Sequence, residues 1–305
     1  MATGTLSAGT RLSLPEYLAQ EQKRIEAEID RLCPPDSEQP PTIHRAMRYS
    51  LLAGGKRIRP ILCMEAARAV RDDVAGIEPA ACSLEMIHTY SLIHDDLPAL
   101  DNDDYRRGKL TNHKVYGEAM AILAGDALLT LAFYTLAHLE NCPAETRVRM
   151  IAELSAASGT INGMIGGQVA DIEGERQEPT AELLDYIHRA KTGALLRASI
   201  RMGAIWAGAT DAQLAALTAY GEHTGLAFQI VDDLLDVEES SAVLGKTAGK
   251  DATQGKITFP AVYGLERSHE MAKTESRLAN EALAMFGDRA ERLREIADMI
   301  VSRKS

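Results

Sequence analysis

Two clusters of aspartates are the residues of this 305-residue chain best suited to do chemistry. They are Asp95, Asp96 and Asp101 in the first cluster, and Asp232, Asp233 and Asp236 in the second. Each cluster follows an apolar run, where ionised carboxylates are costly unless a cation compensates them. Mg²⁺ prefers oxygen ligands and takes only one or two carboxylates when water and substrate phosphate complete its coordination. The two clusters therefore predict a clamp in which Mg²⁺ ions hold a diphosphate.

Two other readings of the clusters are weaker. Solvated acidic caps lack a physical motive, because carboxylates at the C-terminal end of a helix are repelled by the helix dipole. A calcium loop of the EF-hand type starting at Asp101 fails, because Tyr105 and Arg106 stand where an oxygen ligand and a glycine are needed.

The spacing within each cluster sets how it must be presented. Asp232 and Asp236 are four residues apart, so they differ by about 40° around a helix and share a face. Asp95 and Asp101 are six apart, which is about 240° on an unbroken helix. Pro98 lies between them and removes a backbone donor. We therefore expect the second cluster on a straight helix and a break in the chain at Pro98.

Local groups of basic residues indicate an anionic ligand. Lys56 and Arg59 follow a pair of glycines at a predicted helix start, where they form one anion-binding edge. Arg106 and Arg107 come directly after the first cluster, and Arg can bind phosphate oxygens bidentately. His88 lies two helical turns before Asp95, so its imidazole can line the same pocket.

Helical signals dominate the chain. Ser13 to Glu16 and Thr210 to Gln213 have the form of capping boxes, and apolar residues recur at helical spacing over 80–94 and 214–231. No alternating strand pattern of useful length is present, and nothing marks a boundary within the chain. We predict an all-α protein with a single domain over 1–305, in which residues 1–12 are poorly ordered.

Composition restricts the partners and the compartment. A formal charge of −11 disfavours nucleic acid and anionic membrane surfaces as main partners. The four cysteines lack metal or redox spacing, which is typical of reduced thiols. We see no apolar run approaching the roughly 20 residues that a membrane span needs, and no signal peptide. The sequence predicts a protein of the cytoplasm without membrane insertion.

The motifs taken together resemble those of the trans-polyprenyl diphosphate synthases. The stretch from Glu85 to Lys109 is similar to the family's first aspartate-rich motif, and Asp232 to Asp236 is similar to the second. Shorter motifs follow in the family's order; they are Gly54 to Pro60, Gly166 to Gln168, Lys191 to Gly193, Phe228-Gln229 and Gly245 to Thr247. The resemblance implies an isoprenoid synthase fold, a helical bundle around a central cavity, and a homodimer with three Mg²⁺ ions when substrate is bound.

The resemblance also implies roles for individual residues. Isopentenyl diphosphate would be held by Lys56, Arg59, His88 and Arg107. The allylic diphosphate would be held by Arg106, Lys191, Thr192, Gln229, Lys246 and Lys256. The principal metal ligands would be Asp95, Asp101 and Asp232, with Asp96, Asp233 and Asp236 in support.

The implied reaction ionises an allylic diphosphate, such as the dimethylallyl or geranyl compound, and joins the cation to isopentenyl diphosphate. Tyr90 stands five residues before the first aspartate, where an aromatic residue in the family forms the floor of the product tunnel. This predicts farnesyl diphosphate, with geranylgeranyl diphosphate as the alternative. A terpene cyclase is disfavoured because Asp236 and Ser240 stand where its second metal site needs a hydroxyl and a glutamate. A non-catalytic subunit would be expected to lack one cluster.

Overall fold

Capping boxes begin two helices of the computed structural model, as the sequence predicts. The backbone N–H of Ser13 donates to the carboxylate of Glu16 at 3.0 Å, and α1 (Leu14–Leu32) follows. The backbone N–H of Thr210 donates to Gln213 at 3.0 Å, and the hydroxyl of Thr210 accepts from the Gln213 N–H at 3.3 Å before α11 (Asp211–Ala242). These caps satisfy backbone donors that the first turn of a helix leaves unpaired.

The structure describes residues 11–175, 177–242 and 257–303, of which 239–242 are described as backbone only. After α1, the N-terminal half contains α2 (Pro41–Leu51), α3 (Ile58–Val70), α4 (Glu78–Asp95), β1 (Tyr105–Arg106), β2 (Lys109–Leu110), α5 (Asn112–Tyr116), α6 (Glu118–Ala137) and α7 (Ala144–Ser158). The C-terminal half contains α8 (Met164–Gly174), α9 (Ala181–His188), the π-helix η1 (Arg189–Gly193), α10 (Ala194–Trp206), α11, α13 (Phe259–Tyr263), α14 (Leu265–Ala282), the 3₁₀-helix η2 (Ala284–Ala290) and α15 (Glu291–Ser302).

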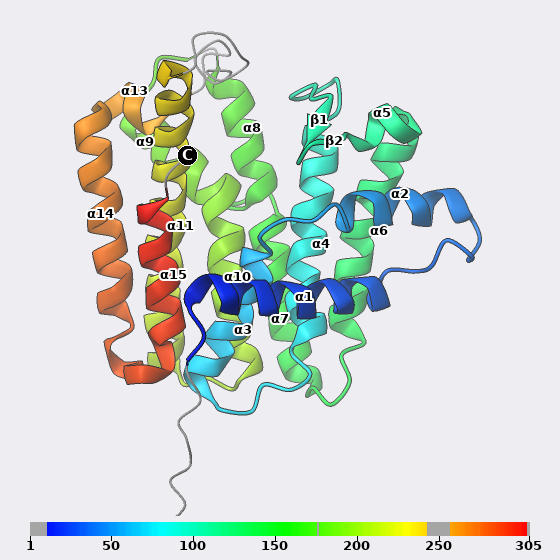
Figure 1. Cartoon of the computed structure of the whole chain (residues 1–305), viewed down its shortest axis with the longest axis horizontal. Coiled ribbons are helices and arrows are strands. Elements are labelled where there is room, and N and C mark those ends of the chain that lie inside the picture. Colours follow the sequence, from blue (N-terminus) through cyan, green and yellow to red (C-terminus); the bar gives the residue numbers. More distant parts are fainter. Residues whose placement is uncertain (1–10, 176, 243–256, 304–305) are drawn as a thin grey trace, which may run out of the picture.

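The long helices run side by side, and α1 and α2 lie across them (Figure 1). The prediction of an all-α fold is confirmed, and in the described residues the one sheet is the hairpin of β1 and β2. The most extensive packing joins α4 to α6, α11 to α14 and α10 to α3. Most of α4 is buried, including Leu84, Met86 and Ile87 with no exposed surface. The apolar run before the first aspartate cluster is therefore a central helix.

The carboxyl ends of α4 and α11 point to the same end of the bundle (Figure 1). The first helix ends in Asp95, and the second carries Asp232 to Asp236 near its own end. The two aspartate clusters are therefore brought to one end of the molecule.

The expectation that no apolar run is long enough to span a membrane is wrong. In the described part of the chain, α6 is long and apolar enough by length and composition alone, and 39% of its most apolar window is buried. The buried part packs on α4 and α2, which is how a core helix acquires such a composition. The apolar remainder of α6 is uncovered in the single chain.

Candidate functional site

The first aspartate cluster is folded back on itself, as the proline predicts. Helix α4 ends at Asp95, and Asp96 occupies the C-cap position. Beyond Pro98 the chain returns, so that the backbone N–H of Asp101 donates to the carbonyl of Asp95 at 2.8 Å. Asp101 thus lies beside Asp95, although six residues separate them. A straight helix would have pointed the two residues apart.

The second cluster lies on a continuous helix, also as predicted. Asp232 and Asp233 are adjacent on α11 and therefore face different neighbours. One oxygen of Asp232 lies 3.3 Å from the guanidinium of Arg303, just beyond the end of α15. Asp233 is 8% exposed and accepts the backbone N–H of Phe259 at 2.9 Å. Asp236, one turn further along α11, is half-buried.

Asp95 and Asp232, the first aspartates of the two clusters, each lie where the ionised form is disfavoured. Burial raises the pKa of Asp95 to about 6, and Lys191 lowers it less than burial raises it. Burial likewise raises the pKa of Asp232 to about 6, against the opposing effect of Arg303. A carboxylate in such a place lacks a sufficient counter-charge. The chemistry of these donors fits a cation that arrives with a ligand.

No protein-only metal cage is formed within the described ranges. No group of three or more His, Cys, Asp or Glu side chains there is arranged to hold a metal ion by itself. Mg²⁺ does not need such a cage, because it is usually bound by one or two carboxylates together with substrate phosphates. The separated carboxylates of Asp95 and Asp232 match that mode of binding.

A basic cavity of about 480 Å³ opens beside the second cluster. It is lined by residues of α3, α4, α11 and the C-terminus; the charged and aromatic ones are Lys56, Arg57, Arg59, Glu85, His88, Arg107, Phe228, Asp232 and Arg303. The Nε of Arg59 is buried without a hydrogen-bond partner. Burial, with Arg59 and Arg107 nearby, holds the pKa of His88 well below its usual range. Unpaired donors around a cavity of this kind suit an anionic ligand.

The floor of this cavity is a buried ion pair. Arg57 is fully buried, donates to Glu85 at 2.7 Å and to the Leu51 carbonyl at 2.8 Å, and has a left-handed φ of 50°. A non-glycine residue in that region signals local strain held by its surroundings. All three basic residues line the cavity, and Arg57 is the one whose charge is paired with a buried carboxylate.

The hairpin after the first cluster sends its two arginines in different directions. Arg107 and Gly108 form its two-residue turn, and their positive φ values of 54° and 73° are typical of a type I′ turn. Arg107 donates to the carbonyl of Gly54. Its guanidinium packs directly against Gly55, where an added Cβ would lie only 2.5 Å from Nη1 of Arg107. The missing side chain of Gly55 therefore admits Arg107 to the cavity wall.

Arg106 turns instead to Asp96. Its Nε donates to the Asp96 carboxylate at 2.7 Å, and Asp96 is 3% exposed. In this structure, Asp96 is thus a partner of Arg106. The supporting metal role of Asp96 and the diphosphate-binding role of Arg106 stay predictions.

The residues predicted to bind the allylic diphosphate are only partly brought together. Lys191 lies in the π-helix η1 and donates to Asp171 of α8 at 2.6 Å. Its charge also lowers the pKa of Asp95. Thr192 follows it and is half-buried. The backbone of η1 approaches α8 closely at Gly167, and only a glycine fits there, because a Cβ would lie 2.2 Å from the backbone N of Lys191. Lys246 and Lys256 lie outside the described residues.

Gln229 belongs to a second polar group, centred on His188. The Nδ1 of His188 lies 3.1 Å from Oε1 of Gln229, and its Nε2 lies 3.2 Å from Asp233. Burial lowers the pKa of His188, but the hydrogen bond and charge of Asp233 raise it overall. Asp233 is therefore held by protein groups on the side of α11 that packs against α9 and α13.

Tyr90 is a core residue of α4 that is 5% exposed. Its ring packs edge-on to the ring of His94, with centroids 5.7 Å apart, and its hydroxyl has no hydrogen-bond partner. Burial raises the pKa of this hydroxyl to about 12. A buried hydroxyl without a partner costs the fold stability, so the hydroxyl of Tyr90 does not stabilise the core.

Sequence reasoning missed four residues of the site. They are Glu85, Asp171, His188 and Arg303, which contact Arg57, Lys191, Asp233 and Asp232 respectively. Glu85 lies within the first motif, and His188 stands three residues before Lys191, so proximity to motifs was an available signal. Nothing in the sequence joins Arg303 to Asp232.

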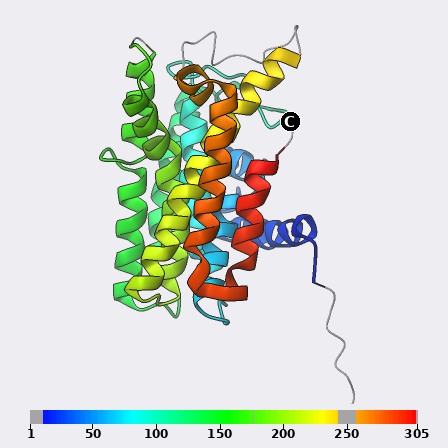
Figure 2. The same ribbon diagram turned by 90° about the vertical axis from the view of Figure 1, so that its left-hand side faces the viewer.

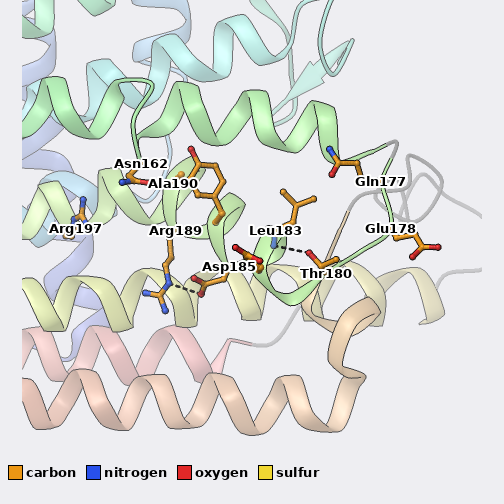
Figure 3. A pocket seen from close by; sticks show the side chains of 11 residues that line it. Asn162, Gln177, Glu178, Thr180, Leu183, Asp185, Arg189, Ala190 and Arg197 are labelled. Carbon is orange, nitrogen blue, oxygen red and sulfur yellow. Dashed lines mark hydrogen bonds and ion pairs between the residues drawn. The ribbon is translucent and has the colours of Figure 1, made fainter.

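Another cavity, of about 620 Å³, lies against α9 and η1 (Figure 3). Arg189 donates to Asp185 at 2.7 Å within it. None of its lining residues belongs to the predicted site, so we assign it no part in the chemistry.

Known proteins with similar sequences are prenyl diphosphate synthases and transferases by name. A family model described as polyprenyl synthetase matches residues 40–298. Dimethylallyltranstransferase of Fischerella ambigua is 48% identical, covering 99% of this chain and 87% of the relative. Farnesyl diphosphate synthase of Geobacillus stearothermophilus is 48% identical over 85% of this chain and 88% of the relative. Geranylgeranyl diphosphate synthase of Cyanophora paradoxa is 45% identical over 97% and 98%.

A solved structure of a prenyl diphosphate synthase has the same fold. The crystal structure of an FPP/GFPP synthase from Zymomonas mobilis superimposes with a TM-score of 0.85 at 35% identity, covering 95% of this chain and 99% of that chain.

Proposed function

The chain belongs to the polyprenyl synthetase family, and from that premise we propose that it makes farnesyl diphosphate by condensing isopentenyl diphosphate with dimethylallyl and geranyl diphosphates. At the coarser level it is a short-chain prenyltransferase. One observation carries the proposal most strongly: α4 and α11 line one basic cavity, and each brings a half-buried carboxylate with a raised pKa to the same end of the bundle.

Isopentenyl diphosphate is assigned to the basic cavity. Lys56, Arg59, His88 and Arg107 supply donors there, and the unpartnered Nε of Arg59 is available to an anion. Because the cavity carries more cationic than anionic groups, it attracts the diphosphate. The alkene would then lie at the inner end, away from water.

The allylic diphosphate is assigned to the space between Asp95 and Asp232, with Lys191 and Gln229 beside it. Mg²⁺ bound by these carboxylates would act as a Lewis acid and neutralise the charge that develops on a departing diphosphate. Lys191 is held by Asp171 at 2.6 Å, so its ammonium is positioned before the substrate arrives. The departing diphosphate is the proposed acceptor of the proton lost after condensation, so no side-chain base is required.

The product length rests on Tyr90. A large, buried side chain one to two turns below Asp95 is suited to stop the growing chain, and this supports farnesyl diphosphate. Geranylgeranyl diphosphate is the second candidate, because relatives of equal similarity carry that name.

We also propose that the enzyme is a homodimer. Large apolar side chains are exposed on α6, α7 and α8; they are Ile122, Leu123, Tyr134, Val148, Ile165 and Val169. These helices gather along one side of the bundle (Figure 2). A second copy would cover them. Light scattering of the eluted protein should give twice the chain mass of 33.1 kDa, and a monomer that is fully active would contradict this proposal.

The test of the reaction is incubation of the purified protein with Mg²⁺, dimethylallyl diphosphate and labelled isopentenyl diphosphate, followed by chain-length analysis. Farnesyl diphosphate is the expected main product. A main product of twenty carbons would establish the second candidate, and no condensation at all would overturn the enzyme assignment.

A further inference from the structure

His188 is a buried polar residue that none of the predicted roles uses. It is 7% exposed and is the last residue of α9, directly before the π-helix that carries Lys191 and Thr192. Single π-turns within helices occur often at functional sites. The side chain thus sits where the lysine-bearing segment meets α11.

Both nitrogens of the His188 ring face oxygens of the predicted site. Nδ1 lies 3.1 Å from Oε1 of Gln229, and Nε2 lies 3.2 Å from Oδ2 of Asp233. Hydrogen bonds to both oxygens need an N–H on each ring nitrogen, because a neutral imidazole has one donor and one acceptor. One imidazole therefore determines how two neighbouring turns of α11 present their polar side chains.

Asp233 depends on this arrangement for its burial. Its carboxylate is 8% exposed, and its Oδ2 accepts the backbone N–H of Phe259 at 2.9 Å in addition to facing His188. The rings of His188 and Phe259 stack with centroids 5.1 Å apart. A buried carboxylate that loses one of two such partners is strongly destabilised. Three segments, the end of α9, α11 and the start of α13, are therefore joined at one carboxylate.

We propose that His188 is a positioning residue for the allylic half of the site, which acts through Gln229 and Asp233 and does not touch the substrate. This rests on the proposed function, since it assigns the allylic diphosphate to Gln229 and Lys191. The isopentenyl cavity has no contact with His188 and should not respond to its loss.

The experiment compares His188→Leu and His188→Gln with the wild-type protein. The leucine variant should raise KM for geranyl diphosphate about 10- to 100-fold, the range expected for losing a hydrogen bond to a charged group. Its KM for isopentenyl diphosphate should change less than about threefold. The glutamine variant keeps a donor for Asp233 and should recover part of the loss. A purely structural role would move both KM values together or neither.

The matched control is His223→Leu. His223 lies on α11, the helix of Gln229 and Asp233, and pairs with Glu275 at 2.7 Å, outside the predicted site. This variant should lose stability without changing either KM. Circular dichroism shows whether each variant is folded, and the glutamine variant carries the test if the leucine variant is not.

Two measurements separate the failure of this inference from the failure of the proposed function. An inactive wild-type protein would refute the condensation itself, whereas an active wild type with unchanged KM values in folded His188 variants would refute only the role of His188. Calorimetric binding of inorganic diphosphate with Mg²⁺ is measured in the same proteins. The part of the binding that requires Mg²⁺ should be weaker in the folded variants, and an unweakened Mg²⁺-dependent step would overturn the proposal even without turnover.

Discussion

Replacing Asp95 with asparagine should stabilise the metal-free protein while removing its activity. Asp95 is largely buried, and its pKa is about 6 against an ordinary value of 3.8. Keeping this group ionised at pH 7 therefore costs the folded state up to about 3 kcal/mol. Water reaches part of the side chain, so we expect a gain of about 1 to 3 kcal/mol in the free energy of unfolding for Asp95→Asn.

The sign of the pH dependence follows from the same values. Between pH 4 and pH 6 the folded protein binds a proton at Asp95 that the unfolded chain does not, so folding is favoured by acid in that window. The contribution of Asp95 to wild-type stability should thus fall as pH rises from 4 to about 6, and the advantage of the asparagine variant should appear over the same range. It should be complete above about pH 7 and absent near pH 4.

Urea unfolding followed by circular dichroism, in EDTA and at several pH values, measures this difference. Asp36→Asn, in an exposed loop, is the matched control and should show no advantage. Condensation by Asp95→Asn in Mg²⁺ should fall by roughly 100-fold or more. A variant that is less stable than wild type at pH 7, or an advantage independent of pH, would refute the argument that Asp95 lacks a counter-charge.

Three further variants test other parts of the site. Tyr90→Ala should lengthen the main product, and an unaltered product distribution would count against Tyr90 as the floor of the tunnel. Arg303→Ala should raise KM for isopentenyl diphosphate about 10-fold, with partial rescue by lysine, because a cation leaves the cavity wall; an unchanged KM would remove Arg303 from the site. Glu85→Gln should lower the free energy of unfolding by about 3 to 5 kcal/mol, because it removes the nearer of the two carboxylates that pair with the buried Arg57; a loss below about 1 kcal/mol would contradict the importance of this pair.

The backbone of the first cluster was predictable because proline chemistry is local. Pro98 cannot continue a helix, and the return of Asp101 to Asp95 follows from that restriction. The straight second cluster and both capping boxes were predictable for the same reason, since each depends on residues within about one helical turn.

The direction of individual charged side chains was not predictable. Whether Arg106 or Arg107 faces the cavity depends on the turn type of a two-residue hairpin, which sets the pairing of its strands. Arg57 was indistinguishable from Lys56 and Arg59 until its left-handed backbone turned it toward Glu85. These choices are made by tertiary packing.

Long-range pairs were beyond sequence reasoning altogether. Arg303 meets Asp232 across 71 positions of the chain, and His188 meets Gln229 across 41. Neither pair has a local spacing that a motif could record. The sequence therefore located both aspartate clusters but not the protein groups that orient and neutralise them.

The central claim is that Asp95 and Asp232, on different helices, jointly bind one metal-bound diphosphate. Isothermal titration of inorganic diphosphate, with and without Mg²⁺, tests it in the wild-type protein and in Asp95→Asn and Asp232→Asn. A binding step that requires Mg²⁺ should appear beside any metal-independent binding in the basic cavity, and each variant alone should weaken that step by about 10-fold or more. The absence of a Mg²⁺-dependent step, or a step that survives unchanged in either variant, would contradict a shared clamp.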